Sequence, residues 1–132
     1  MGKVHIKPSN VASHKVVDVV VDRSEKLNAL DTPLIADIVK SFRDLGQDDE
    51  LRAVVLSGIG KAWVVGADIK EMATLDRHTA AAFISHLHDA MLSIRDLPVP
   101  VIAKIHGFAL GGGMELAAAC DLRIASDDAR FG

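Results

Sequence analysis

The chain has 132 residues, a length within the range of one domain, and it is 49% hydrophobic and 25% charged with a net charge of −3. Lys and Arg total 15 against 18 Asp and Glu and form no basic block, which argues against a nucleic-acid-binding surface. No apolar run is long enough to span a bilayer and the first residues are too polar for a secretory signal, so we expect neither a membrane protein nor a secreted one.

The first third of the chain predicts a strand, a polar turn and a helix. Residues 16–21, Val-Val-Asp-Val-Val-Val, are rich in β-branched side chains and indicate a mostly buried strand. A polar turn over residues 22–28 follows. Apolar residues then recur at helical spacing, with Thr32 as the expected N-cap, Pro33 in the first turn and Gly46 closing the helix.

The remainder of the chain continues to alternate between strands and helices. The same patterns predict a buried strand, a short extended piece, a long helix, a strand, a short helix and a final strand, over residues 53–57, 62–65, 79–96, 101–105, 114–119 and 122–125. Such alternation favours an α/β architecture with crossover connections and a largely parallel core sheet. No internal repeat or interdomain linker interrupts it.

Two glycine-bearing junctions follow extended segments, at Gly66-Ala67-Asp68 and at Gly111-Gly112-Gly113. Glycine lets the backbone approach a ligand closely and present bare N–H groups to it. In an α/β sheet both junctions are expected near the carboxyl ends of strands, where ligands bind. If Ala67 and Gly112 each give one N–H to the same oxygen, they form an oxyanion hole. The alternative is that the glycines only permit tight turns.

Charged residues near these junctions differ in what they predict. Glu115 has the apolar neighbours Met114 and Leu116, and a carboxylate there is costly to desolvate unless it is paired or used, which favours a functional role. Asp68 and Glu71 precede or begin a helix and are expected to complement its dipole. Lys70 is expected on the surface, with contact to a phosphate-bearing ligand as the alternative.

Other patterns predict structure rather than chemistry. No phosphate loop, dinucleotide-binding fingerprint or zinc spacing is present, and His86 and His88 point to different faces of their helix, so we expect no metal. His106 is expected to stabilise a turn, and Trp63 to lie in the core or a pocket wall. The single cysteine, Cys120, excludes an intramolecular disulfide and is expected to be a small buried thiol in a protein of the reducing cytoplasm.

Three segments together resemble the crotonase family, the enoyl-CoA hydratases and isomerases. They are the turn at residues 23–30, the segment of residues 53–58 followed by 60–63 and 66–72, and the strand, glycine loop and helix at residues 100–121. The resemblance implies a crotonase-like spiral of ββα units. Residues 1–132 would be the N-terminal part of that core domain, with the C-terminal part absent.

The resemblance also implies roles for individual residues. The N–H groups of Ala67 and Gly112 would hold the thioester oxygen of an acyl-CoA, and Glu115 matches the first of two glutamates that act on a catalytic water. The remaining substrate-binding positions would be Lys26, Leu27, Ala29, Asp68, Ile69, Lys70 and Gly111. The implied reaction is the addition of water to a trans-2-enoyl-CoA, giving a 3-hydroxyacyl-CoA, as in the β-oxidation of fatty acids. No cofactor is implied, because coenzyme A is part of the substrate.

The sequence departs from the family pattern at two places. Val65 stands where the family usually has a smaller residue, which would narrow the acyl pocket. The chain stops at Phe131-Gly132, whereas family members are about twice as long, have their second glutamate just beyond a matching Phe-Gly, and form trimers or dimers of trimers. There are two alternative functions. One is double-bond isomerisation on the same scaffold, and the other is that of a non-catalytic CoA-binding subunit made of this half alone.

Overall fold

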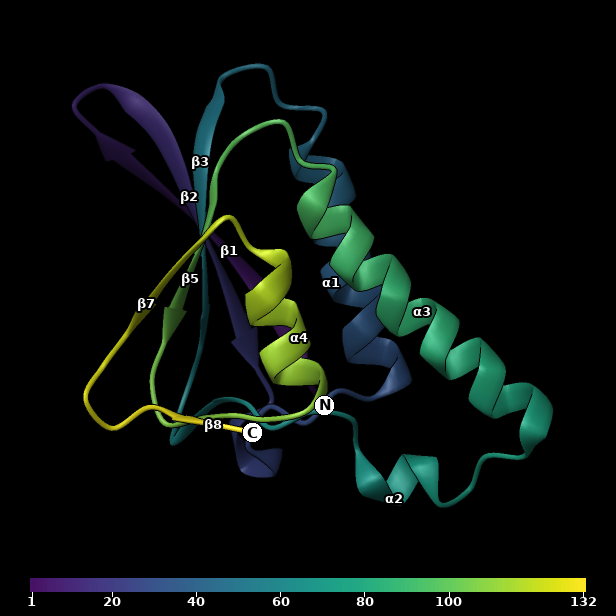
Figure 1. Cartoon of the computed structure of the whole chain (residues 1–132). Helices are drawn as coiled ribbons and strands as arrows, with labels where there is room; N and C mark the ends of the chain where they lie inside the picture. The colour runs from purple at the N-terminus through teal and green to yellow at the C-terminus, as the bar shows by residue number, and fades with distance from the viewer.

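The computed structural model describes residues 1–132 as two β-sheets with helices on one side of the larger sheet (Figure 1). The strands are β1 Lys3–Val11, β2 His14–Asp22, β3 Leu51–Gly58, β4 Ala62–Val64, β5 Val101–Ile105, β6 Phe108–Ala109, β7 Leu122–Ala125 and β8 Arg130–Phe131. The helices are α1 Thr32–Leu45, α2 Ile69–Met72, α3 Arg77–Arg95 and α4 Gly112–Ala119, with a single 3-10 turn over Ser24–Lys26.

The larger sheet has the strand order β1-β2-β3-β5-β7, and every neighbouring pair except β1–β2 is parallel. Its centre is built from β-branched runs that lie in register, so that Val17 pairs with Val54 and Val54 with Val101. All three side chains are buried in one connected apolar core. The prediction of a largely parallel α/β sheet is therefore confirmed.

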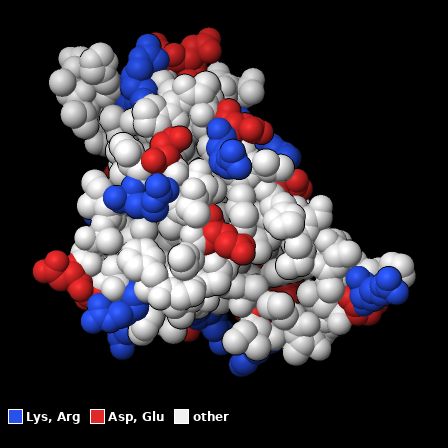
Figure 2. Space-filling view, in the orientation of Figure 1, with Lys and Arg blue, Asp and Glu red and all other residues white.

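Helices α1, α3 and α4 cover the same face of this sheet, and α3 packs against both of the others (Figure 1). The predicted apolar stripe of α1 is buried, with Leu34, Ile38 and Phe42 at most 1% exposed. No helix is both long and apolar enough to cross a membrane. Charges of both signs are interspersed on the face shown in Figure 2, without a patch of one sign.

Near the N-terminus one prediction is wrong and one strand was not predicted. The N-cap of α1 is Asp31, whose carboxylate accepts the Leu34 N–H at 3.0 Å, while Thr32 is already the first helical residue. Strand β1 was not predicted. It is a mostly exposed edge strand joined to β2 by a two-residue turn at Ala12 and Ser13, whose φ angles are 49° and 70°. Such turns usually carry Asn or Gly, so this sequence gives no hairpin signal.

The smaller sheet, β4-β6-β8, is parallel and positions both glycine junctions. Gly66 follows β4, and the triple glycine follows β6. The junctions thus leave the carboxyl ends of adjacent parallel strands as predicted, although the second leaves β6 rather than the strand over 101–105. Helix α4 lies close to β4, since a Cβ on Gly113 would come within 2.0 Å of the Val64 carbonyl oxygen. Only glycine permits this packing.

Cys120 closes α4 as the predicted buried thiol. It is 5% exposed, and its Sγ–H donates to the Leu116 carbonyl oxygen at 3.3 Å. Burial raises the pKa of the Cys120 thiol to about 12, so almost no thiolate forms near neutral pH.

We therefore predict that the native protein does not react with a thiol reagent such as Ellman's reagent at pH 8. After unfolding in urea, one thiol per chain reacts rapidly. Absorbance of the released thiolate measures both rates. Equal rates for native and unfolded protein would contradict the buried position of Cys120.

Candidate active site

The main-chain N–H of Ala67 is left without an acceptor by the pairing of its loop. Leu30 and Ala67 form an isolated parallel bridge in which the Leu30 N–H donates to the Gly66 oxygen at 2.7 Å and the Asp68 N–H donates to the Leu30 oxygen at 2.8 Å. In this pattern the two bonds use the groups flanking Ala67 and not its own N–H. Ala67 is half-buried, and its N–H donates to no group of the chain.

The N–H of Gly112 is free for a different reason, because it opens helix α4. The N–H of Gly111 donates to the Gly132 oxygen at 2.8 Å, and that of Gly113 donates to the Leu110 oxygen at 2.8 Å. Gly112 lies between them, and its N–H has no acceptor in the chain. An N–H at the first turn of a helix is a favourable partner for negative charge.

The two loops touch at their glycines. A Cβ on Gly66, where φ is +99°, would lie 2.9 Å from the Leu110 oxygen and 3.4 Å from the Gly112 nitrogen. A Cβ on Gly112 would lie 3.8 Å from the Cα of Gly66. Residues 66 and 112 are far apart in sequence, and the structure brings their main chains into contact, with the unpartnered Ala67 N–H one residue away.

A cavity of about 440 Å³ opens beside the Ala67 loop. Its walls contain seven of the predicted site residues, together with Val65 and two residues that were not predicted, Phe108 and Leu110: Lys26, Leu27, Ala29, Val65, Ala67, Asp68, Ile69, Lys70, Phe108 and Leu110. Gly111, Gly112 and Glu115 do not line it. The position of Leu110 directly before the triple glycine was the signal that could have identified it.

The lining of this cavity is mostly apolar, with cations at its edge. Leu27, Phe108 and Ile69 are large hydrophobic side chains that remain exposed, Ile69 to 81%. Lys26 and Lys70 are exposed and form no ion pair with any carboxylate of the chain. The site can therefore accept an apolar group together with a negatively charged one.

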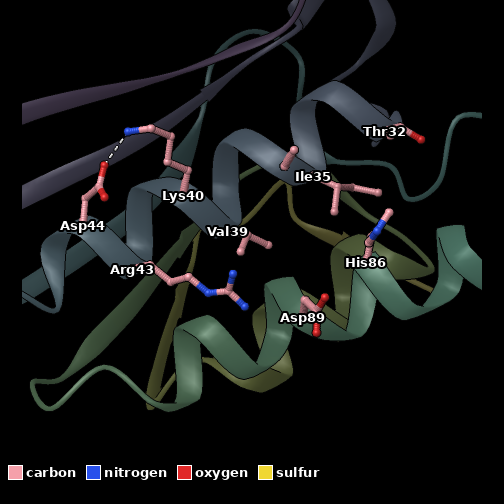
Figure 3. Close-up of a pocket in the computed structure, with 9 residues that line it drawn as sticks. Thr32, Ile35, Val39, Lys40, Arg43, Asp44, His86 and Asp89 are labelled. Atoms are coloured by element: carbon pink, nitrogen blue, oxygen red, sulfur yellow. Dashed lines mark hydrogen bonds and ion pairs between the residues drawn. The ribbon is translucent and has the colours of Figure 1, made fainter.

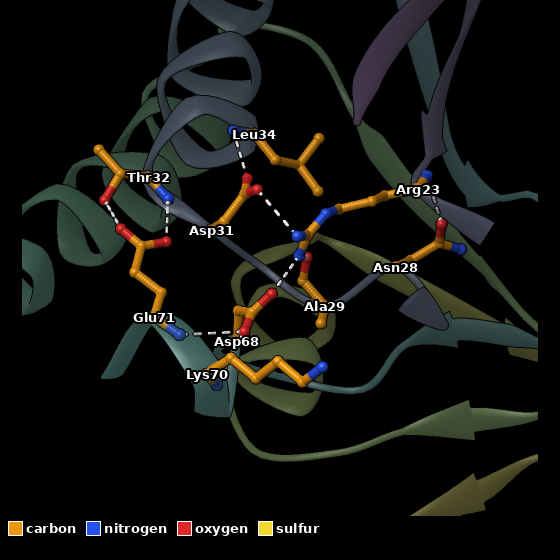
Figure 4. A network of polar contacts seen from close by, with 9 residues as sticks. All are labelled: Arg23, Asn28, Ala29, Asp31, Thr32, Leu34, Asp68, Lys70 and Glu71. Carbon is orange, nitrogen blue, oxygen red and sulfur yellow. Dashed lines mark hydrogen bonds and ion pairs between the residues drawn. The ribbon is translucent and has the colours of Figure 1, made fainter. Parts of the chain in front are cut away.

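Asp68 lines the cavity, but its carboxylate is used inside the protein. One oxygen accepts the N–H groups of Lys70 and Glu71 at 2.9 and 3.1 Å, which makes Asp68 the N-cap of α2. The other oxygen accepts from Arg23 Nη1 at 2.6 Å (Figure 4). The Arg23 guanidinium beside it holds the pKa of Asp68 below its ordinary value. Asp68 therefore positions the loop.

Glu71 acts on a different helix from the one expected. It lies in the first turn of α2, as predicted, but its carboxylate accepts the N–H of Thr32 at 2.8 Å and also bonds the Thr32 hydroxyl (Figure 4). Glu71 therefore ties α2 to the N-terminus of α1, next to the Leu30–Ala67 bridge.

Asn28 was predicted only as part of a polar turn, without a role of its own. Its side chain is completely buried, and its Nδ2 lies within hydrogen-bond distance of the carbonyl oxygens of Ile59, Ala62 and Trp63, at 2.8–3.1 Å. Its Oδ1 accepts the Arg23 N–H at 2.8 Å. The turn over residues 23–30 is thus fastened to the segment that leads into the glycine loop, which no local sequence pattern could show.

Glu115 lies in a different environment from the one predicted. The side chain is exposed and forms no hydrogen bond or ion pair, so the expected desolvation cost is absent. Its apolar neighbours in sequence do not enclose it, because the helical period turns Gly113, Leu116 and Ala117 inward and leaves Met114 and Glu115 on the outer face of α4. The backbone N–H of Glu115 donates to the Gly111 oxygen at 3.0 Å, which keeps the residue one turn from the triple glycine.

The two structural expectations for aromatic residues are met. His106 Nε2 lies 2.7 Å from the Gly60 carbonyl oxygen and links two turns. Trp63 is fully buried, with its indole N–H donating to the Leu56 oxygen at 3.3 Å.

A second cavity, of about 500 Å³, lies between α1 and α3 (Figure 3). Its charged lining includes Lys40, which pairs with Asp44 of the same helix at 2.6 Å, and Arg43, whose side chain extends toward α3. None of the predicted site residues and neither glycine loop contributes to it. The candidate site is therefore the cavity beside Ala67.

Comparison with known proteins identifies the family. A sequence model described as enoyl-CoA hydratase/isomerase matches residues 12–132, which is nearly the whole chain. The chain belongs to the enoyl-CoA hydratase/isomerase family. The family resemblance drawn from the sequence is confirmed.

Individual members of the enoyl-CoA hydratase/isomerase family are similar to this chain in sequence and in structure. The chain is 40% identical to the short-chain-enoyl-CoA hydratase of Clostridium acetobutylicum over 119 residues, which cover 89% of this chain and 46% of that protein. It is 34% identical to the human mitochondrial enoyl-CoA hydratase domain-containing protein 2 over 118 residues, covering 89% and 40%. A crystal structure of enoyl-CoA hydratase from Bacillus anthracis superposes with a TM-score of 0.90 at 33% identity, covering 98% of this chain and 50% of that one.

These likenesses establish a crotonase-like fold, as the resemblance implied. The chain spans about half the length of the curated relatives it matches. Within that half lie both of the glycine loops that characterise the site described above.

The contact between the loops predicts the effect of a methyl group at Gly66. In Gly66→Ala the new Cβ meets the Leu110 oxygen at 2.9 Å, in a backbone conformation that disfavours L side chains, so we expect the free energy of unfolding to fall by about 1–3 kcal/mol. Gly46→Ala is the matched control, because Gly46 has φ −63° and its Cβ would meet nothing closer than 3.4 Å. Urea unfolding followed by circular dichroism measures both variants. Equal stabilities of the two variants would contradict the close contact.

Proposed function

We propose that this protein is an enoyl-CoA hydratase that holds the thioester oxygen of a trans-2-enoyl-CoA between the N–H groups of Ala67 and Gly112. The observation that carries the proposal is that these two N–H groups have no acceptor within the chain and belong to loops that touch. Main-chain donors that are already in place stabilise an oxyanion without reorganisation during the reaction.

The proposed chemistry uses these donors at the step where charge develops. Water adds its oxygen to the β-carbon of the conjugated thioester, and the electron pair of the double bond moves toward the carbonyl, giving an enolate. The N–H groups of Ala67 and Gly112 stabilise the negative oxygen of that enolate. A proton then reaches the α-carbon on the same face, so that one molecule of water is added in total and the thioester is re-formed.

The cavity beside Ala67 suits the two chemically different parts of an acyl-CoA. Its apolar walls, including Leu27, Phe108 and Leu110, fit the acyl chain and the methylene groups of the pantetheine arm. The unpaired cations of Lys26 and Lys70 fit the phosphates of coenzyme A. Val65 also lines this cavity, and in our proposal its branched side chain limits the bulk of the acyl group.

Glu115 is the proposed acid–base residue. Its carboxylate is solvent-accessible and unpaired, one helical turn from Gly111 and Gly112, so it is free to hold a water molecule near the oxyanion donors. In this proposal residues 1–132 form the N-terminal part of a crotonase-like core, and the complete protein forms trimers or dimers of trimers. We place it in a reducing compartment such as the cytoplasm, because its one cysteine is unpaired.

The test of the proposed function is an assay of the protein expressed from its complete reading frame. Hydration of crotonyl-CoA is followed by the loss of absorbance of the conjugated thioester, and a 3-enoyl-CoA is assayed in parallel for isomerisation. The proposal predicts hydration of crotonyl-CoA. Isomerisation without hydration would assign the protein to the isomerases instead, and CoA binding without either reaction would make it a non-catalytic subunit.

A substitution at Glu115 tests its role within the same assay. We expect Glu115→Gln to lower the hydration rate about 10²–10⁴-fold with little change in acyl-CoA affinity, because the amide cannot take a proton from water. Glu50→Gln is the control, since Glu50 is exposed and lies before β3, away from both glycine loops. Turnover in Glu115→Gln equal to that of the control would remove Glu115 from the mechanism.

A further inference from the structure

We propose that Arg23 is a positioning residue for the oxyanion donor at Ala67, an inference that rests on the proposed function of that N–H. Arg23 is not among the residues that line the cavity, so it does not act on a substrate directly. It acts through the main chain on either side of Ala67.

The guanidinium of Arg23 joins three groups from two separate segments (Figure 4). Nη1 donates to the Asp68 carboxylate at 2.6 Å and to the Ala29 carbonyl oxygen at 3.0 Å, while Nη2 lies 3.1 Å from the Asp31 carboxylate. The side chains of Arg23, Asp31 and Asp68 are only 12–16% exposed. A planar fork of N–H donors can serve all three acceptors at once, which the single ammonium group of lysine cannot do in the same geometry.

These contacts enclose the bridge that orients the Ala67 peptide. Ala29 and Asp31 flank Leu30, whose N–H and carbonyl group bond Gly66 and Asp68 on either side of Ala67. Arg23 therefore bonds the residues before and after Leu30 on one segment and the residue after Ala67 on the other. Rotation of the Ala67 peptide would break contacts to Arg23 as well as the two bridge hydrogen bonds.

The energetics favour a positioning role over a purely stabilising one. Desolvation of a largely buried ion pair offsets much of its attraction, so such pairs contribute little net stability compared with apolar replacements. A donor to an oxyanion, in contrast, depends on fixed direction, since its effect is largest when no reorganisation is needed. The contacts of Arg23 hold the Ala67 peptide in one orientation and so fix the direction of its N–H.

The test uses variants that each remove one part of the Arg23 network and keep the rest. Arg23→Ala would leave two nearly buried carboxylates, those of Asp31 and Asp68, without a cationic partner and can unfold the loop. Asp68→Asn keeps an oxygen that can cap α2 and removes the ion pair with Arg23. Arg23→Lys keeps the positive charge and removes the planar set of guanidinium N–H donors. Lys40→Met is the control, because it removes the exposed ion pair with Asp44 on α1, remote from the Ala67 loop.

The readout is the infrared carbonyl stretch of bound butyryl-CoA labelled with ¹³C at the thioester carbon, a saturated thioester that the proposed hydration cannot consume. In the unmodified protein and in Lys40→Met we expect a shift to lower wavenumber on binding. In Asp68→Asn and Arg23→Lys at least half of that shift is lost, while the dissociation constant changes less than threefold. A role in folding alone would not change the carbonyl polarisation of the bound molecule.

The outcomes separate this inference from the function on which it rests. No shift in the unmodified protein would refute the proposed oxyanion hole, and the role of Arg23 with it. A shift that is undiminished in both variants would leave the proposed function standing and overturn the role of Arg23. Loss of the native circular dichroism spectrum in both variants would also overturn it, because Arg23 would then be a determinant of folding. The amides of Leu30 and Asp68 give a ligand-free check, since they should exchange with solvent at least tenfold faster in both variants.

Discussion

The close approach of the main chain at Gly66 to the main chain at Gly112 is the constraint on which the site depends. Each N–H donor, at Ala67 and at Gly112, is unremarkable alone, because turns and helix starts commonly leave an N–H without an acceptor. What distinguishes them is that a side chain at Gly66 would collide with the Leu110 oxygen and press on the Gly112 nitrogen. The absence of that side chain lets the main chains of two distant segments come into contact, and the small parallel sheet brings those segments together.

The two loops are held by independent sets of contacts. The first is held by Leu30 through main-chain hydrogen bonds, and by Arg23 and Asn28 through side chains. The second is held by the end of the chain, where the Gly132 oxygen accepts the Gly111 N–H and β8 pairs with β6. Because neither set uses the N–H of Ala67 or Gly112, the structure can be rigid around the donors while leaving them free. This combination suits a protein that binds a developing negative charge.

The parts of the structure that follow from local pattern were predictable, and those that depend on distant partners were not. Strand β2 could be recognised from its β-branched run, and helices α1 and α3 from apolar residues at helical spacing. In these elements the spacing along the chain determines which side chains are buried. The glycine junctions were recognisable because closely spaced glycines before a helix have few structural uses. Strands β6 and β8 were missed, since two residues carry no period.

The hydrogen bonds around Arg23 could not be predicted from sequence. Arg23 and Asp68 are 45 positions apart, and nothing near either residue in sequence indicates the pairing. Local reasoning also failed for Glu115, because apolar neighbours along the chain lie on a different side of the helix from the carboxylate. Sequence therefore identified most of the residues that line the cavity beside Ala67, mainly through the family resemblance. It did not identify the residues that hold those groups in place.

The most direct test of the account is a crystal structure of the protein with a saturated acyl-CoA thioester bound. We predict that one oxygen atom, that of the thioester, lies about 2.7–3.1 Å from both the Ala67 and the Gly112 nitrogens. A bound thioester whose oxygen contacts only one of these nitrogens, or faces away from both, would contradict it.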